Sequence, residues 1–116
     1  MKRKEIKTPN NRYHSMWLLA LFDLPTETKE DRRNYREFRN SLLKEGFEQL
    51  QYSVYARYVG DEKRAETFKK KIRNVVPPKG EVRIISLTDI QFGKMEIYYQ
   101  NSKRKPEEKL DQLLLF

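Results

Sequence analysis

The sequence predicts an α+β protein whose secondary structure follows the order strand, helix, strand, strand, helix, strand. Three observations carry this prediction. Segments with alternating or continuous apolar residues, which are typical of strands, are separated by segments whose apolar residues recur at helical spacing. Proline and glycine stand at most of the boundaries between them. The 116 residues of the chain are the length of one domain.

The first strand is expected over residues 16–22, which are apolar at odd and even positions alike. A strand has this pattern when both faces of its sheet are covered. Residues 23–25 end the strand, and Thr26 or Thr28 then caps a helix. The apolar positions of this helix are Tyr35, Phe38, Leu42 and Leu43. Gly46 ends the helix.

The middle of the chain, residues 47–59, is rich in β-forming residues and is long enough for two strands or one bent strand. Asp61 then caps a second helix. Its apolar positions are Ala65, Phe68, Ile72 and Val75. Residues 77–80, which include two prolines and a glycine, end this helix. Two more strands are expected, over residues 82–88 and 94–99.

This order is that of the split βαβ, or ferredoxin-like, arrangement (βαββαβ), here with an additional C-terminal strand. Both helices of such a fold lie on one face of an antiparallel sheet, so the other face stays open. An open face conflicts with the two-sided apolar character of residues 16–22. A second copy of the chain is the simplest cover, because symmetric homodimers are the commonest oligomers. We therefore expect a homodimer.

Three regions are expected along the chain. Residues 1–15 form a flexible basic arm, residues 16–99 form the ferredoxin-like domain, and residues 100–116 form a linker and an apolar C-terminal tip. The tip consists of Leu110 and residues 113–116. We expect it to dock on another surface, because an apolar tip of this kind is stabilised by burial.

Composition excludes several classes of protein. Without Cys the chain has no disulfide framework, thiolate metal site or cysteine nucleophile, and its single His cannot build a histidine-rich metal site. A net charge of +8 and a pI near 9.7 favour a polyanionic partner, with nucleic acid as the leading candidate. The longest apolar run is far shorter than the roughly 20 residues that span a bilayer, so we expect no membrane partner and a cytoplasmic location.

Asp23 is the candidate metal-ligating residue. It stands at the carboxyl end of the first apolar strand, where a carboxylate suits a hard cation such as Mg²⁺. One carboxylate makes a poor site, but two copies of Asp23 near a dimer twofold axis would share an ion. The alternative is that Asp23 caps a turn or the amides of the following helix.

The candidate nucleic-acid-binding residues lie on the first helix. They are Arg32, Arg33, Arg36 and Arg39. Helical spacing puts Arg32, Arg36 and Arg39 on a common side, and arginine suits bidentate phosphate contact. The alternative is a solvated face on which Asp31 and Glu37 pair with these arginines.

Three tyrosines of the middle segment are a further candidate surface. Tyr52, Tyr55 and Tyr58 would stack on bases, as sheet aromatics do in RNA-binding modules of this topology. The glycine-containing signature of those modules is absent, which favours burial of the tyrosines in the core.

Several segments together resemble a known family, the small second Cas protein of CRISPR adaptation modules. They are residues 22–25 (FDLP), 27–28 (ET), Arg33, 35–39 (YREFR), 46–55 (GFEQLQYSVY), 77–82 (PPKGEV) and 88–95 (TDIQFGKM). The resemblance covers residues 16–99, and residues 46–55 and 91–92 are most similar to the version found in type II systems.

The resemblance implies a ferredoxin-like homodimer that bridges dimers of the CRISPR integrase and binds double-stranded prespacer DNA during spacer acquisition. It implies Asp23 as the catalytic and metal-binding residue of a Mg²⁺- or Mn²⁺-dependent endonuclease activity, and the arginines of the first helix as contacts to the DNA backbone. The C-terminal tip has two candidate surfaces, the edge of the dimer's own sheet, by strand addition, and a groove on the integrase, and we favour the integrase. Two alternatives remain: a free metal-dependent endonuclease acting on single-stranded RNA or double-stranded DNA, and a ferredoxin-like RNA-binding module.

Overall fold

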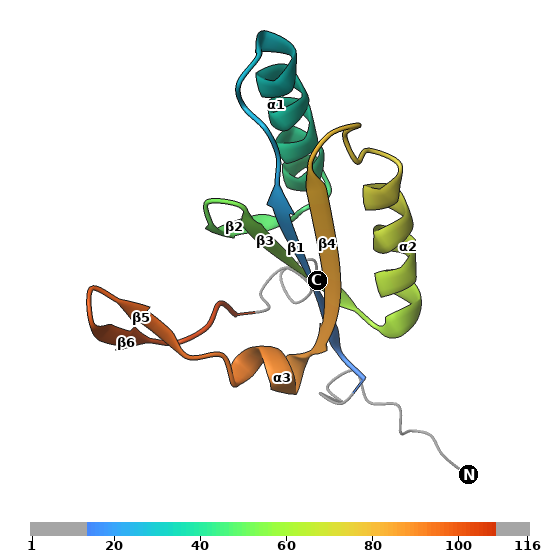
Figure 1. The fold of residues 1–116 in the computed structure, drawn as a ribbon. Helices are drawn as coiled ribbons and strands as arrows, with labels where there is room; N and C mark the ends of the chain where they lie inside the picture. Colours follow the sequence, from blue (N-terminus) through green and yellow to red (C-terminus); the bar gives the residue numbers. More distant parts are fainter. Residues whose placement is uncertain (1–13, 109–116) are drawn as a thin grey trace.

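The protein is described by a computed structural model over residues 14–108, and its fold is shown in Figure 1. The elements are β1 (Met16–Asp23), α1 (Lys29–Lys44), β2 (Glu48–Gln51), β3 (Val54–Gly60), α2 (Glu62–Arg73), β4 (Glu81–Thr88), α3 (Asp89–Gly93), β5 (Ile97–Tyr99) and β6 (Ser102–Arg104). The first six elements and their order are those that the periodicity predicts. The middle segment forms two strands, separated by a turn at Tyr52 and Ser53.

The main sheet has four strands in the order β2-β3-β1-β4, and all neighbouring strands are antiparallel. Together with the two long helices this is the ferredoxin-like arrangement expected from the sequence. β1 is a central strand: the Cα atom of Leu19 pairs with that of Ala56 on β3 and with that of Ile85 on β4. Most β1 side chains are buried on both faces of the sheet, which explains why β1 is apolar at successive positions.

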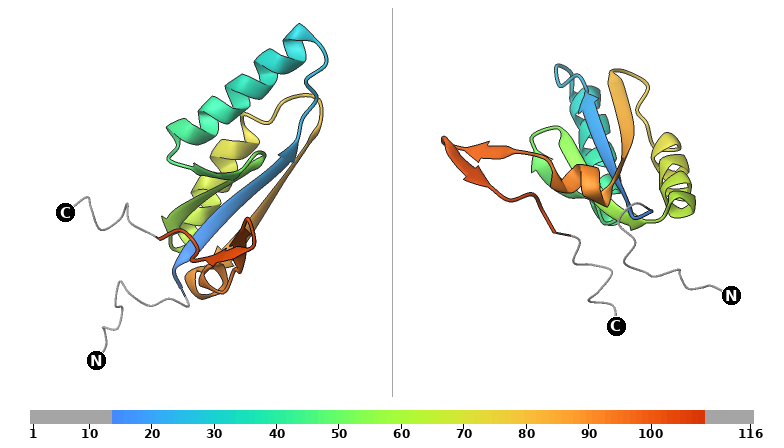
Figure 2. Two further views of the ribbon diagram at one scale, coloured as in Figure 1. Left: turned by 90° about the vertical axis from the view of Figure 1, so that its left-hand side faces the viewer. Right: turned by 90° about the horizontal axis from the view of Figure 1, so that it is seen from below.

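Helices α1 and α2 pack on one face of this sheet, as Figure 2 shows. Capping residues define where they start: the Thr28 side chain accepts from the backbone N–H of Asp31, and the Asp61 side chain accepts from that of Arg64. The core between helices and sheet contains Leu18, Ala20 and Phe22 of β1, Tyr55 and Val59 of β3, Phe38 and Leu42 of α1, and Ala65, Phe68 and Ile72 of α2. Burial of these side chains on both layers holds the helices to the sheet.

The opposite face of the sheet is partly covered by the chain itself, a cover that the sequence did not predict. Helix α3 places Phe92 flat on Trp17, with ring centroids 3.8 Å apart. Asp89 accepts a hydrogen bond of 2.8 Å from the indole N–H of Trp17. Phe92, Trp17 and Tyr58 are all buried as a result. Ile85, further along the same face, remains 46% exposed.

Helix α3 has a capping signal of its own. The Thr88 hydroxyl accepts from the backbone N–H of Gln91, and the Gln91 side chain accepts from the backbone N–H of Thr88. This is a capping box, which marks helix starts at the level of sequence. The hydrophobic periodicity does not predict α3, because a helix of five residues is too short to show a helical repeat.

The C-terminal part of the domain forms a hairpin that projects from the body beyond α3 (Figure 1). The additional strand, β5, pairs with β6 in a separate two-stranded sheet, with the Cα atom of Tyr98 opposite that of Lys103. The turn between the strands is made by Gln100 and Asn101, both with positive φ. We expected residues 102–104 to be part of a linker, but they form the strand β6. Their polar sequence shows no strand pattern, and the strand is formed by backbone pairing with β5.

None of the helices within residues 14–108 is long and apolar enough to cross a membrane. Residues 1–13 of the expected basic arm, and the apolar tip at residues 110–116, lie outside the described residues.

Candidate functional site

Asp23 is the last residue of β1, and its side chain is exposed. Because side chains alternate along a strand, Asp23 lies on the same face of the sheet as Trp17 and Leu19, opposite the two long helices. The Cα atom of Asp23 pairs with that of Glu81 on β4. The Glu81 carboxylate is already paired with Arg83, at 3.0 Å between Oε2 and Nη2.

The backbone beside Asp23 is held by a close approach of Gly80. Gly80 has a φ of +92°, and a Cβ atom there would lie 2.7 Å from the Asp23 carbonyl oxygen and 2.7 Å from Leu24 Cδ2. Only glycine accommodates both the positive φ and that contact without a shift of its neighbours. The end of β1 is therefore packed tightly although the Asp23 side chain is exposed.

The capping interpretation of Asp23 is not supported. Thr28 and Asp31 form the capping box of α1, so the helix amides are already satisfied by other side chains. Within residues 14–108 the Asp23 carboxylate makes no hydrogen bond or ion pair. An exposed carboxylate without a partner is free to bind a cation or another molecule.

The residues around Asp23 fit one half of a hard-cation site. No cluster of three or more His, Asp and Glu residues suited to a metal ion occurs in the part of the chain that the structure describes. A single carboxylate leaves most ligand positions of Mg²⁺ to water and substrate oxygens. A shared site with the Asp23 carboxylate of a second chain is the arrangement that the sequence predicts.

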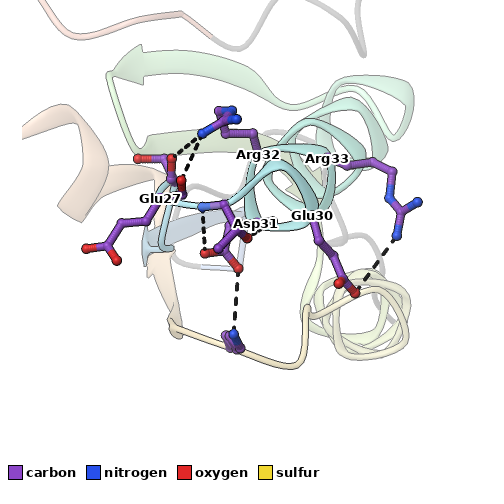
Figure 3. A network of polar contacts seen from close by, with 8 residues as sticks. Glu27, Glu30, Asp31, Arg32 and Arg33 are labelled. Carbon is purple, nitrogen blue, oxygen red and sulfur yellow. Dashed lines mark hydrogen bonds and ion pairs between the residues drawn. The ribbon is translucent and has the colours of Figure 1, made fainter.

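The four arginines are all on α1, but they have different surroundings, and Figure 3 shows those of Arg32 and Arg33. Arg32 Nη1 donates to the carbonyl oxygens of Thr26 and Glu27, at 3.1 Å each, and so holds the turn that precedes the helix. Arg33 points to the other side of the helix, where its Nη2 lies 3.9 Å from Glu30 Oε2. Both groups of that pair are exposed, so the pair is weak.

Arg36 and Arg39 are the two arginines of α1 whose guanidinium groups make no hydrogen bond or ion pair within the described part of the chain. Arg36 is exposed and Arg39 is half-buried. Arg36 lies one helical turn after Arg32, and Arg39 lies one turn before Leu43, so helical spacing puts both on the same side of α1 as Arg32. The expected pairing of Asp31 with these arginines does not occur. Asp31 is instead buried in the capping box, 3.9 Å from Lys79 Nζ.

The three tyrosines divide into two groups. Tyr55 and Tyr58 are buried on opposite faces of β3, as expected for core residues. Tyr52 lies in the β2–β3 turn and is 73% exposed, with its ring stacked on that of Tyr35 from α1. Partial burial and the hydrogen bond with Tyr52 raise the pKa of Tyr35 above its ordinary value of 10.0.

Comparison with known proteins identifies the family. A family model described as CRISPR associated protein Cas2 matches residues 16–95, which include β1 with Asp23, all of α1 and the start of the segment after α3. The chain belongs to the Cas2 family. The match confirms the resemblance that the sequence segments indicated.

Two Cas2 relatives match nearly the whole chain. A protein of Flavobacterium psychrophilum named CRISPR-associated endoribonuclease Cas2 is 42% identical over 106 residues, which are 91% of this chain and 92% of that protein. A protein of the same name from Parvibaculum lavamentivorans is 43% identical over 101 residues, which are 87% of this chain and 100% of that protein. Another Cas2 relative, from Ligilactobacillus salivarius, is 46% identical over 80 residues, 69% of this chain and 79% of that protein.

Proposed function

We propose that this Cas2-family protein acts as a homodimeric DNA-binding scaffold in CRISPR spacer acquisition, bridging dimers of the CRISPR integrase along a double-stranded prespacer. The observation that carries the proposal is the pair of unpaired guanidinium groups, Arg36 and Arg39, on an exposed edge of α1 in a Cas2-family chain. Arginine that is not already neutralised by a carboxylate is available to phosphate oxygens.

Charge supports a backbone-directed mode of binding. The chain carries a net charge of +8, and within residues 14–108 no constellation of side chains on a helix end or hairpin suggests reading of base edges in a groove. Binding of this kind is independent of sequence, which suits a protein that handles DNA of any origin. Arg32 contributes indirectly, because it fixes the turn between β1 and α1 and so the position of the α1 edge.

The homodimer rests on the open face of the sheet. Helix α3 covers the Trp17 end of that face but leaves Ile85 46% exposed beside the partly buried Leu21 and Val54. A second copy of the chain placed there buries these side chains and brings two copies of Asp23 into the same interface. The apolar tip at residues 110–116 then remains for the integrase, where its leucines fit side-chain pockets.

A metal-dependent endonuclease is the second candidate, favoured by two observations. The relatives are named endoribonucleases, and Asp23 is an unpaired carboxylate at a strand end. In a dimer, Asp23 of both chains would hold a Mg²⁺ or Mn²⁺ ion, which supplies Lewis-acid activation of water and phosphate. The same site serves RNA or DNA, because the phosphodiester group is common to both.

Spacer acquisition in cells separates the two candidates. Asp23→Ala is compared with Glu81→Ala, which removes the neighbouring carboxylate across the strand pair. For a scaffold, acquisition survives both substitutions; for an essential nuclease it is lost with Asp23→Ala alone. Loss of acquisition by Asp23→Ala, with dimer and duplex binding intact, would overturn the scaffold as the sole function.

Co-purification with the integrase tests the bridging role. The full chain and a chain that ends at Glu108 are compared, because this truncation removes the tip and keeps the β5–β6 hairpin intact. We expect the truncated chain to remain folded and bind duplex DNA but to lose the integrase. Retention of the integrase, or a loss of the dimer, would assign the tip to another surface.

A further inference from the structure

A groove runs between α1 and the C-terminal end of α2, the two helices that lie on one face of the sheet (Figure 2). It consists of two hollows, of about 300 Å³ and about 180 Å³, that share Ser41 and Val75 among their lining residues. The groove belongs to the helix layer, on the side of the sheet away from the open face. It therefore stays accessible when a second copy of the chain covers that open face.

The groove has an apolar floor that is only partly shielded from water. Phe38, Leu42 and Ile72 line it and are buried members of the core. Val75 and Val76 follow α2 and are 40% and 43% exposed. Apolar side chains exposed inside a hollow are stabilised by contact with an apolar group of another molecule. The floor therefore suits one or two aliphatic side chains of a ligand.

Two side-chain amides at the larger hollow have hydrogen-bonding capacity to spare. Asn34 and Asn74 both line it, and within residues 14–108 neither amide makes a hydrogen bond. A side-chain amide donates and accepts, which matches the N–H and C=O groups of a peptide backbone. An extended segment leaves those backbone groups free, whereas a helix pairs them internally. The amides therefore favour an extended protein segment over a helix.

Two charges of opposite sign stand along the groove. Glu37 lines the larger hollow and Lys44 lines the smaller one, and neither side chain forms an ion pair in the part of the chain that the structure describes. They are two helical turns apart on one side of α1, which is about 10 Å at a rise of about 1.5 Å per residue. An extended chain spans about the same distance in three residues.

We propose that the groove binds an extended segment of a partner protein in which a basic and an acidic residue stand three positions apart, with aliphatic residues between them. The basic residue pairs with Glu37 and the acidic residue with Lys44. The aliphatic residues contact Val75 and Val76. This inference goes beyond the proposed function, since neither the arginines assigned to DNA nor Asp23 line the groove.

Titration of synthetic peptides into the isotopically labelled full chain, followed by NMR, tests the proposal. The probe peptide contains Arg-Val-Leu-Glu flanked by serines. One control peptide has Ser in place of Val and Leu, and the other has Glu in place of Arg. The side-chain amide signals of Asn34 and Asn74 report on the groove directly, because both residues line it.

Two variants, each with a matched control, locate the binding site. Glu37→Lys reverses the charge in the groove, and Glu62→Lys makes the same change at an exposed position at the start of α2. Val76→Ser removes an apolar contact in the groove, and Leu43→Ser does so at a residue of α1 that is 39% exposed but does not line the groove. Circular dichroism verifies that each variant is folded.

We expect the probe peptide to shift the amide signals of Asn34 and Asn74 and to bind more tightly than either control peptide. Glu37→Lys weakens binding of the probe peptide about fivefold or more, because attraction becomes repulsion. The same variant binds the peptide with Glu in place of Arg more tightly than the natural chain does. Val76→Ser also weakens binding of the probe peptide, whereas Glu62→Lys and Leu43→Ser bind it like the natural chain.

The proposal is wrong if the natural chain binds none of the peptides, or binds all three equally. It is also wrong if Glu62→Lys loses as much affinity as Glu37→Lys, since net charge alone would then account for binding. Signals of Asn34 and Asn74 that shift with protein concentration, without peptide, would give the groove to a second copy of the chain and overturn the proposal. No DNA is present in the test, so its outcome is independent of the proposed function.

Discussion

Phe92 and Trp17 lie face to face, with ring centroids 3.8 Å apart and an angle of 1° between the ring planes. The contact joins the short helix α3 to the central strand β1, on the face of the sheet that the two long helices do not cover. The indole N–H of Trp17 is satisfied at the same place by Asp89, so the indole is buried without an unpaired donor. One end of the open face thereby becomes part of the monomer's own core.

Phe92→Ala is expected to lower the free energy of unfolding by about 3–5 kcal/mol, because it removes a fully buried ring and leaves a cavity over Trp17. Chemical denaturation measures the change, and the fluorescence of Trp17 reports on this contact directly, since the chain has one tryptophan. Phe92→Leu fills most of the cavity and should lower the free energy of unfolding much less. Equal losses for the two variants would show that ring stacking rather than cavity filling holds α3.

Ile85→Lys is expected to convert a homodimer into a folded monomer. Ile85 lies at the middle of the open face and is 46% exposed, so a charge there opposes burial against a second copy. Sedimentation equilibrium at micromolar concentration measures the mass. Val76→Lys is the matched control, because Val76 is 43% exposed and follows α2. A natural chain that is monomeric at this concentration would refute the dimer.

Charge reversal of Arg36 and Arg39 together is expected to weaken duplex binding and to lower the slope of log affinity against log salt by about two, one for each lost phosphate contact. Fluorescence anisotropy over a series of salt concentrations measures both effects. Lys70 and Arg73 on α2, reversed together, make the same change in net charge at a different surface. Equal losses for the two double variants would remove α1 from the DNA-binding surface.

Asp23→Asn is expected to abolish any hydrolysis of phosphodiesters by the protein, because the amide keeps the shape of the side chain but removes the charge that holds a divalent ion. Cleavage of labelled RNA and DNA with Mg²⁺, with Mn²⁺ and with a chelator measures this. Glu81→Gln should cleave normally, since Glu81 is paired with Arg83. Cleavage by a pure Asp23→Asn dimer would place the chemistry at another residue.

Tyr35 is expected to stay protonated to a higher pH than an exposed tyrosine, because partial burial and its hydrogen bond with Tyr52 raise its pKa above 10.0. The folded state then binds this proton more tightly than the unfolded state. The contribution of Tyr35 to stability is present below pH 10.0 and is lost as the pH rises through the folded-state pKa. Tyr35→Phe should remove that part of the loss of stability at alkaline pH, whereas Tyr98→Phe should not. Ultraviolet absorbance of the phenolate measures the titration.

The sequence by itself determined the order of the main elements and placed Asp23 at a strand end and four arginines on one helix. These features depend on local properties. The alternation of side chains on a strand, the helical spacing of apolar residues and the capping residues Thr28 and Asp61 all act within a few neighbouring positions. Continuous segments such as residues 46–55 also indicated the family, because they resemble the corresponding segments of its members.

The tertiary structure alone decided which of these candidates are free to act. Tyr52, Tyr55 and Tyr58 are alike in sequence, but distant side chains bury two of them and leave the third on a turn. Arg32 is engaged by a folded turn, whereas Arg36 and Arg39 are not. Trp17 and Asp89 are 72 positions apart, so no local pattern indicates their hydrogen bond. Burial and pairing result from contacts between residues distant in the chain, and those contacts exist only once the layers have packed.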